Sequence, residues 1–236
     1  MKRNQKIKKI IEKHVEKNGL EDGRKPILDG ITNPEFYDAA PIKILFVLKE
    51  AYNKSESQSN GPGEGGWNHI EEIKGENVDI NQNPTYQRIS IISSCLLRNF
   101  SLSKYKNKNF SWEDALKDFN SIAWINVGKF PAPGISTTSD PRLCKAYDYW
   151  KPVLLKEIEI INPDVIIFGN TFKVFEKDLL KDLTLLGNKG RSRALKDEEG
   201  RLLIDTYHPA VRSCTISEEE YINSIRALVK KFGIKR

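Results

Sequence analysis

The sequence predicts an α/β protein, a three-layer α/β/α sandwich built on a short, mainly parallel central sheet of four strands. Four short apolar runs, bounded by proline, glycine or charged residues, predict buried strands. Segments with helical periodicity lie between these runs, and strands that alternate with helices favour a parallel sheet covered on both faces. The four predicted strands are residues 42–48, 122–127, 164–168 and 202–206.

Amphipathic patterns predict the helices that cover this sheet. Near the N-terminus, apolar residues recur at helical spacing with lysines between them. Pro141 suits the first turn of a long helix, where its missing N–H would have no partner in any case. Ser217 and Glu220 have the spacing of a capping box. The predicted helices are residues 4–18, 86–99, 112–119, 140–161, 171–180 and 217–232.

The chain of 236 residues suits one domain. Residues 1–41 are expected to form an N-terminal helix and loop packed on residues 42–236. Residues 52–85 are polar and rich in Asn, Ser, Gly and Glu, and an irregular stretch beyond about 15 residues is usually functional or disordered. Residues 183–201 are expected to hold a small hairpin or a loop.

The composition is typical of a soluble globular protein, with 39% hydrophobic and 30% charged residues. No apolar stretch approaches the roughly 20 residues that span a membrane. The basic N-terminus lacks the apolar region of a signal peptide. We therefore expect a cytoplasmic monomer without a membrane partner.

The net charge of +6 favours a polyanionic partner such as DNA, although a surplus of charge for solubility explains it equally well. Cys95, Cys144 and Cys214 are far apart and include no CxxC pair, so neither a disulfide framework nor a structural zinc is expected. With three histidines in the chain, a histidine-rich metal site is not expected either.

Polar side chains follow three of the predicted strands. Glu50 comes after the first, Asn126 ends the second and His208 comes after the fourth. In an open α/β sheet, the carboxyl ends of the strands line the ligand crevice. A carboxylate, an amide and an imidazole are therefore expected at one edge, and this trio suits cleavage of a bond between a sugar and a base.

Each of these side chains has a chemical role in such a cleavage and an ordinary structural alternative. Glu50 would orient water and stabilise an oxocarbenium-like sugar, or it would cap its loop at the surface. His208 would donate to the leaving base, or it would be a structural histidine. Asn126 would pair with the edge of a pyrimidine, or it would bond its own loop backbone.

An aromatic residue, Trp67, follows the glycine-rich run 61–66 in the long polar loop. Its ring would stack on an extruded base, an interaction worth roughly 1–3 kcal/mol, or it would anchor the loop on the core. The glycines would bring backbone N–H groups close to a phosphate. The Lys-Ser/Thr pair of a P-loop does not follow them.

Three segments resemble motifs of the uracil-DNA glycosylase superfamily. Residues 48–52, Leu-Lys-Glu-Ala-Tyr, resemble its first motif, a Gly-Gln-Asp-Pro-Tyr type sequence that ends a strand. Residues 122–129 resemble the strand that presents the base-reading asparagine, and residues 207–210, Tyr-His-Pro-Ala, resemble the His-Pro-Ser motif. The likeness covers roughly residues 42–232 and implies the α/β/α sandwich of that superfamily.

This resemblance implies a role for each motif residue. Glu50 falls on the water-activating acid, and Tyr52 falls on the aromatic that screens the base at its 5-position. Asn126 reads the edge of the base, and His208 stabilises the departing base. Trp67 is the candidate for the aromatic that stacks on the base.

Contacts with DNA are also implied. In that superfamily, residues just after the histidine motif wedge into the duplex, and Val211 and Arg212 occupy this position. Lys49, Lys129 and Arg212, near the mouth of the site, are expected to hold phosphates. DNA binding should then weaken with salt.

The chain departs from the superfamily in three respects. Residues 131–155 and 161–169 resemble the branch that binds an iron–sulfur cluster through four cysteines, yet this chain has no cysteine at the positions of those four ligands, so no cluster is expected. Glu50 replaces an aspartate and lengthens the acid by one methylene. The loop over residues 52–85 replaces a compact segment. A longer loop would enlarge the pocket and so change which base fits.

The sequence thus predicts a monofunctional DNA glycosylase without metal or cofactor. It would flip out a uracil or a modified pyrimidine and hydrolyse its N-glycosidic bond, leaving an abasic site. The long loop motivates a second option, a phage-defence glycosylase that excises a hypermodified base such as a glucosylated cytosine. Two rival classes are a non-catalytic nucleic-acid-binding module on the same fold and a hydrolase of nucleosides or nucleotides.

Overall fold

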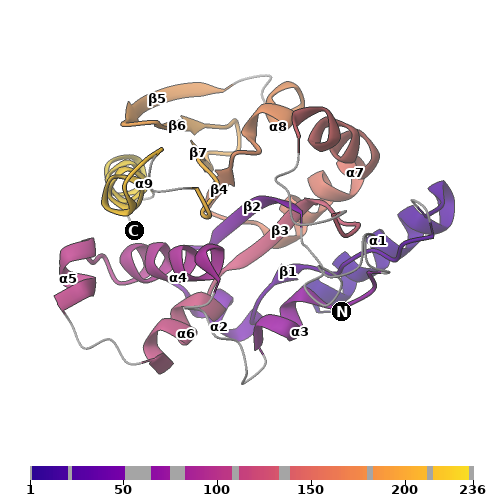
Figure 1. The fold of residues 1–236 in the computed structure, drawn as a ribbon, viewed down its shortest axis with the longest axis horizontal. Coiled ribbons are helices and arrows are strands. Elements are labelled where there is room, and N and C mark those ends of the chain that lie inside the picture. The colour runs from indigo at the N-terminus through magenta and orange to yellow at the C-terminus, as the bar shows by residue number, and fades with distance from the viewer. Residues whose placement is uncertain are drawn as a thin grey trace.

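A mixed sheet of seven strands forms the centre of the described part of the protein (Figure 1). The computed structural model describes residues 2–20, 23–50, 65–74, 83–107, 112–132, 139–179, 183–211 and 215–233. The spatial order of the strands is β1-β3-β2-β4-β7-β6-β5. The strands are β1 (Gly30–Ile31), β2 (Ile44–Glu50), β3 (Ala123–Gly128), β4 (Val165–Gly169), β5 (Thr184–Lys189), β6 (Ser192–Lys196) and β7 (Leu202–Thr206).

The α/β class is confirmed, but the prediction of a mainly parallel sheet of four strands is wrong. The four predicted strands correspond to β2, β3, β4 and β7, which are parallel to one another. β1 pairs with β3 in the antiparallel sense, and the hairpin β5–β6 adds two more antiparallel pairings beside β7. β1 has two residues, and β5 is exposed or half-buried along its length, so neither carries the apolar run that predicted the others.

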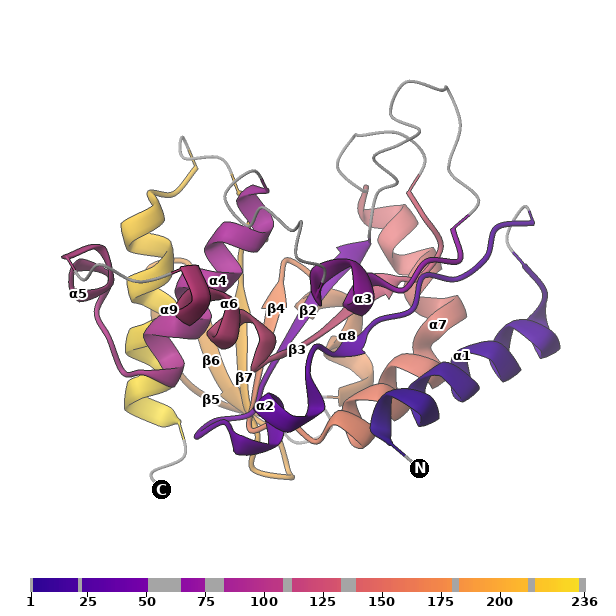
Figure 2. The same cartoon turned by 90° about the horizontal axis from the view of Figure 1, so that it is seen from below.

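Helices cover both faces of this sheet (Figure 2). One face packs against α4, α6 and α9, and the other packs against α1, α7 and α8. Among the described helices, none is long and apolar enough to cross a membrane. The helices are α1 (Arg3–Asn18), α2 (Pro34–Ala39), α3 (His69–Lys74), α4 (Pro84–Leu97), α5 (Leu102–Asn107), α6 (Trp112–Asn120), α7 (Asp140–Ile161), α8 (Phe172–Leu179) and α9 (Glu218–Phe232).

The central strand β2 shows how the sequence builds both halves of the core. Phe46 and Leu48 face the α4 and α9 side, whereas Leu45 and Val47 face the α7 side, and each is at most 1% exposed. A strand buried on both faces is a continuous apolar run rather than an alternating one. The run ends before Glu50, so the first carboxylate of the strand appears at its carboxyl end.

A cluster of buried ionisable residues lies just beyond β3. The Lys129 ammonium lies 2.7 Å from Asp29 Oδ1 and 2.8 Å from Glu157 Oε2, and all three side chains are at most 1% exposed. We call these residues the Lys129 cluster. Asp29 Oδ2 also accepts a hydrogen bond from the backbone N–H of Asn126 at 2.8 Å. The cluster therefore joins the segment before β1, the end of β3 and helix α7.

Burial and neighbouring charges shift the pKa values of Glu157 and Lys129 in the Lys129 cluster. Burial raises the pKa of Glu157, with the nearby Asp29 carboxylate adding to this effect and Lys129 opposing it. Burial alone would lower the pKa of Lys129, but the two carboxyl groups outweigh burial and raise it. The cluster thus holds one ammonium together with two carboxyl groups, and the pKa of one of them, Glu157, is raised.

We expect Lys129→Met to destabilise the protein by about 3–5 kcal/mol at pH 8, because two buried carboxyl groups lose their cation. Urea denaturation measures this change. The loss should shrink toward pH 5, because the buried Glu157 carboxyl group, whose pKa is raised, then binds a proton in the folded variant. Lys156→Ala, at an exposed lysine of α7, should change stability by less than about 0.5 kcal/mol. A loss below about 1 kcal/mol for Lys129→Met at pH 8 would contradict this account.

Candidate active site

The carboxyl ends of β3, β2, β4 and β7 lie side by side in the sheet. In the register of the strands, Asn126 lies beside Leu48 and Glu50 lies beside Gly128. A Cβ atom built on Gly169, at the end of β4, would lie 3.5 Å from the Cα atom of His208. The chain after β7 thus passes close over the end of β4. The fold brings Glu50, Asn126 and His208 to one edge of four adjacent strands.

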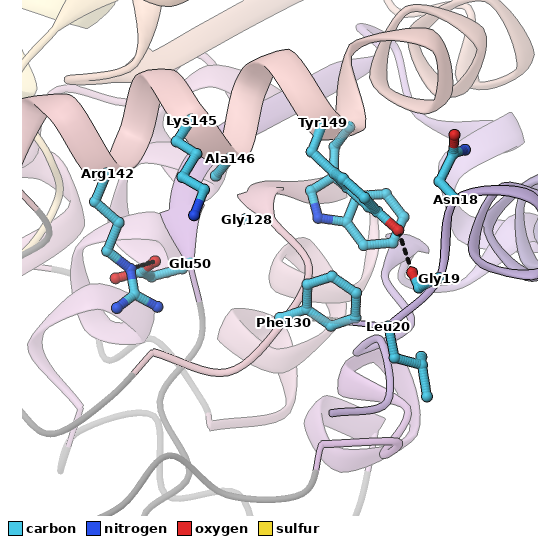
Figure 3. A pocket seen from close by; sticks show the side chains of 11 residues that line it. Asn18, Gly19, Leu20, Glu50, Gly128, Phe130, Arg142, Lys145, Ala146 and Tyr149 are labelled. Atoms are coloured by element: carbon cyan, nitrogen blue, oxygen red, sulfur yellow. Dashed lines mark hydrogen bonds and ion pairs between the residues drawn. The ribbon is translucent and has the colours of Figure 1, made fainter. Parts of the chain in front are cut away.

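The Glu50 carboxylate is buried next to a guanidinium group (Figure 3). Its side chain is 3% exposed, and its Oε2 atom lies 3.4 Å from Nε of Arg142, in the first turn of α7. A Cβ atom on Gly128 would lie 3.3 Å from Glu50 Cβ and 3.4 Å from Oε2. The absence of a side chain at Gly128 therefore leaves space for the carboxylate, and Arg142 stabilises its negative charge.

The Asn126 side chain is buried and has a defined orientation. The indole N–H of Trp124 donates to Asn126 Oδ1 at 3.1 Å. An indole nitrogen is a donor only, so the oxygen and not the nitrogen of the amide must face it. Trp124 is itself held edge-on against His69, with ring centroids 4.8 Å apart, and against Tyr86 at 5.5 Å. Asn126 consequently keeps its NH₂ group on the side away from Trp124.

The imidazole of His208 is held in one tautomer. The backbone N–H of Ala210 donates to His208 Nδ1 at 3.1 Å, so Nδ1 is the acceptor and the ring proton is on Nε2. Burial lowers the pKa of His208 to about 4, and the positive charge of Lys49 contributes to this shift. At neutral pH the ring is uncharged and offers Nε2–H as a donor.

Two residues that the sequence did not single out hold the loop after β7. Arg88 of α4 donates through Nη1 to the carbonyl of Pro209 at 2.5 Å and also to the carbonyl of Val211. The hydroxyl of Tyr221, from α9, donates to the carbonyl of Tyr207 at 2.9 Å. A sequence signal for Arg88 does exist, since an arginine interrupts a run that is otherwise apolar or uncharged in a predicted helix.

The structure changes the interpretation of the predicted phosphate-binding lysines. Lys129 is fully buried and already neutralised by carboxyl groups, so the prediction that it holds a phosphate is wrong. Lys49 is 7% exposed, and burial lowers its pKa. Its ammonium acts on the site through the charge that it places near His208 and Glu50. Arg212 lies outside the described residues.

Three further residues were predicted to contact the base or the DNA, and the structure describes two of them, Trp67 and Val211. Trp67 is half-buried, and its carbonyl accepts a hydrogen bond from the N–H of Leu28 at 3.0 Å, which ties its backbone to the segment before β1. Val211 is half-buried and packs on the core beneath α4 and α9. Stacking by Trp67 and wedging by Val211 stay predictions. Tyr52 lies outside the described residues.

No group of three or more potential ligands for a metal ion occurs in the part of the chain that the structure describes. Comparison with models of known protein families finds no match, and no curated protein matches the sequence.

We expect His208 to remain neutral down to about pH 5 and to titrate near pH 4, because burial disfavours the imidazolium form. Nitrogen-15 NMR of the ring measures both the midpoint and the tautomer. Between pH 6.5 and 4, the unfolded chain binds a proton that the folded chain does not. The wild type should therefore lose up to about 1.4 kcal/mol of stability per pH unit relative to His208→Asn as the pH falls. A midpoint near pH 6.5 would show that the ring is not held in this way.

We expect Trp124→Phe to release the Asn126 amide, because the substitution removes the donor to Oδ1. The loss of this hydrogen bond should cost about 1 kcal/mol beyond the cost of the smaller ring. NMR signals of the Asn126 side-chain NH₂ group should shift or broaden. Trp150→Phe, which truncates a buried indole elsewhere, is the control for the smaller ring. Unchanged Asn126 signals in Trp124→Phe would contradict the orientation described above.

Proposed function

We propose that this protein is a monofunctional DNA glycosylase that hydrolyses the N-glycosidic bond of uracil or of a modified pyrimidine. The observation that carries the proposal is that two side chains of complementary chemistry, Glu50 and His208, lie at the same edge of the sheet. His208 is held as a neutral donor through Nε2–H, and Glu50 is held as a buried carboxylate beside Arg142. These are the two groups that cleavage of a sugar–base bond requires on opposite sides of the bond.

In this mechanism, the bonding electrons of the N-glycosidic bond leave with the base. The Nε2–H of His208 donates to an oxygen of the departing base and stabilises its growing negative charge. The carboxylate of Glu50 stabilises the positive charge that develops on the sugar and orients a water molecule toward C1′. The water oxygen bonds to C1′, and one of its protons passes to Glu50 or to solvent. The base leaves as an anion and takes up a proton from solvent, so the products are a free base and an abasic site.

Asn126 would set the choice of base. Trp124 donates to one of the two lone pairs of the amide oxygen, and the NH₂ group of Asn126 offers two donor hydrogens to a ligand. Two donor hydrogens favour a carbonyl oxygen on the edge of the base, as uracil presents. A site that hydrogen-bonds its ligand can reject analogues by about 10⁴–10⁵-fold. A modified pyrimidine, including a hypermodified one that a phage-defence enzyme would excise, is the other member of this substrate class.

The proposal is tested by base release from duplex and single-stranded DNA that carries uracil, 5-hydroxymethyluracil, hypoxanthine or glucosylated hydroxymethylcytosine. Alkali-labile sites from the wild type should identify the base. Glu50→Gln and His208→Ala should each lower the rate by about 10²–10³-fold. The matched control is Glu159→Gln, which alters an exposed glutamate of α7 away from the strand ends.

Two outcomes would contradict the proposal, and each would indicate a different function. If no member of the panel is cleaved while salt-sensitive DNA binding persists, the protein is a binding module on this fold. If the protein does not bind duplex DNA and instead cleaves free nucleosides or nucleotides, it is a small-molecule hydrolase.

A further inference from the structure

A cavity of about 200 Å³ adjoins Glu50 on the side of the sheet that α7 covers (Figure 3). Its walls come from the turn after α1, the carboxyl ends of β2 and β3, and one face of α7. Glu50 lines the cavity, whereas Asn126 and His208 do not. The cavity is therefore separate from the position at which we propose that the target base lies.

Aromatic rings form one end of this cavity. Phe130 and Trp150 pack with ring centroids 5.0 Å apart, and Tyr149 meets Trp150 edge-on at 4.9 Å. His14 of α1 packs against both Tyr149 and Trp150. Trp150 is 1% exposed, so its ring belongs to the core of the protein. A flat ring is the natural occupant of such an aromatic end.

Charged groups form the other end. Glu50 and Arg142 pair there, and Lys145 points into the cavity between them and the aromatic rings (Figure 3). Lys145 has no ion-pair partner within the described residues. Two cations and one carboxylate leave this end with a net positive charge, which suits an anionic group.

The spacing of the α7 residues sets the length of the cavity. Arg142 and Tyr149 are seven residues apart, or about 10 Å along the helix axis. Ala146 lies between them, and its small side chain leaves the space between the two ends open. The cavity is smaller than the roughly 300 Å³ of typical small-molecule sites, so it suits one nucleotide unit rather than two.

We propose that this cavity is a second nucleotide-binding subsite. The nucleobase packs on the aromatic end, and Lys145 and Arg142 hold the phosphate. The occupant is either the nucleotide that neighbours the target in the same DNA strand or a free nucleotide. Both sources present the same chemistry, a planar ring joined to a phosphate through a sugar.

Calorimetric titration of the full chain with thymidine 5′-monophosphate tests the subsite. Thymidine alone and inorganic phosphate alone should each bind more weakly than the nucleotide, since each contacts only one end. Lys145→Ala should weaken nucleotide binding by about tenfold or more, because a hydrogen bond to a charged group is lost. Ala146→Leu should abolish binding by filling the cavity. Lys156→Ala, an exposed lysine of the same helix, should leave binding unchanged.

The proposal is overturned if the wild type does not bind the nucleotide, or if Lys145→Ala and Ala146→Leu bind it as the wild type does. Its failure is distinguishable from failure of the proposed glycosylase activity. His208→Ala should lose base release and keep nucleotide binding, because His208 does not line the cavity. Loss of nucleotide binding in His208→Ala would place the nucleotide at the catalytic edge and contradict a separate subsite.

Competition with DNA identifies the source of the nucleotide. If the cavity holds the neighbouring nucleotide of the strand, a saturating duplex with an abasic site should prevent binding of thymidine 5′-monophosphate. If the ligand is a free nucleotide, it should bind to the protein–duplex complex with the same affinity as to the protein alone. Either result supports the subsite and decides between the two sources.

Discussion

One buried ammonium group determines where the end of β3 can lie. Removing a charge from water costs several kcal/mol unless a partner of opposite charge meets it. Lys129 meets Asp29 and Glu157, so the segment before β1, the end of β3 and helix α7 must come together for the chain to fold. The same groups hold Asn126, because Asp29 accepts its N–H and the ammonium lies 3.4 Å from its carbonyl oxygen. The base-reading residue that we propose thus depends on charges that never reach the surface.

The arrangement of the strand ends depends on close approaches at two glycines as well as on hydrogen bonds and ion pairs. Gly128 leaves room for the Glu50 carboxylate, and Gly169 lets the chain near His208 pass over the end of β4. Arg88 and Tyr221 then hold the carbonyl groups on either side of His208. Side chains from α4 and α9 therefore fix a loop whose chemistry is used at the sheet edge. The orientation of the His208 imidazole therefore depends on the packing of α4 and α9 on that face of the sheet.

The sequence predicted the parts of the fold that rest on local patterns, and it missed those that rest on distant partners. The apolar runs of β2, β3, β4 and β7 were readable, and residues 140–161 matched α7, because a single chain segment carries each signal. β1 is two residues long and exists because β3 offers it a partner. Lys129 looked like a surface lysine, since its partner Asp29 is 100 positions away in the chain. Glu50, Asn126 and His208 were found because strand ends share one edge, while the roles of Trp124 and Arg88 appear only in three dimensions.

Helix α7 carries both Arg142, beside Glu50, and Glu157, in the Lys129 cluster. These two residues are fifteen positions apart, so their relative direction is set by the winding of the helix. Each residue turns an α-helix by about 100°, and inserting one residue between them would point Arg142 away from Glu50 while Glu157 stayed in place. The number of residues between positions 142 and 157 therefore fixes the direction of Arg142 relative to Glu157. Natural variants of this chain should accordingly change the length of their surface loops far more readily than the number of residues between positions 142 and 157.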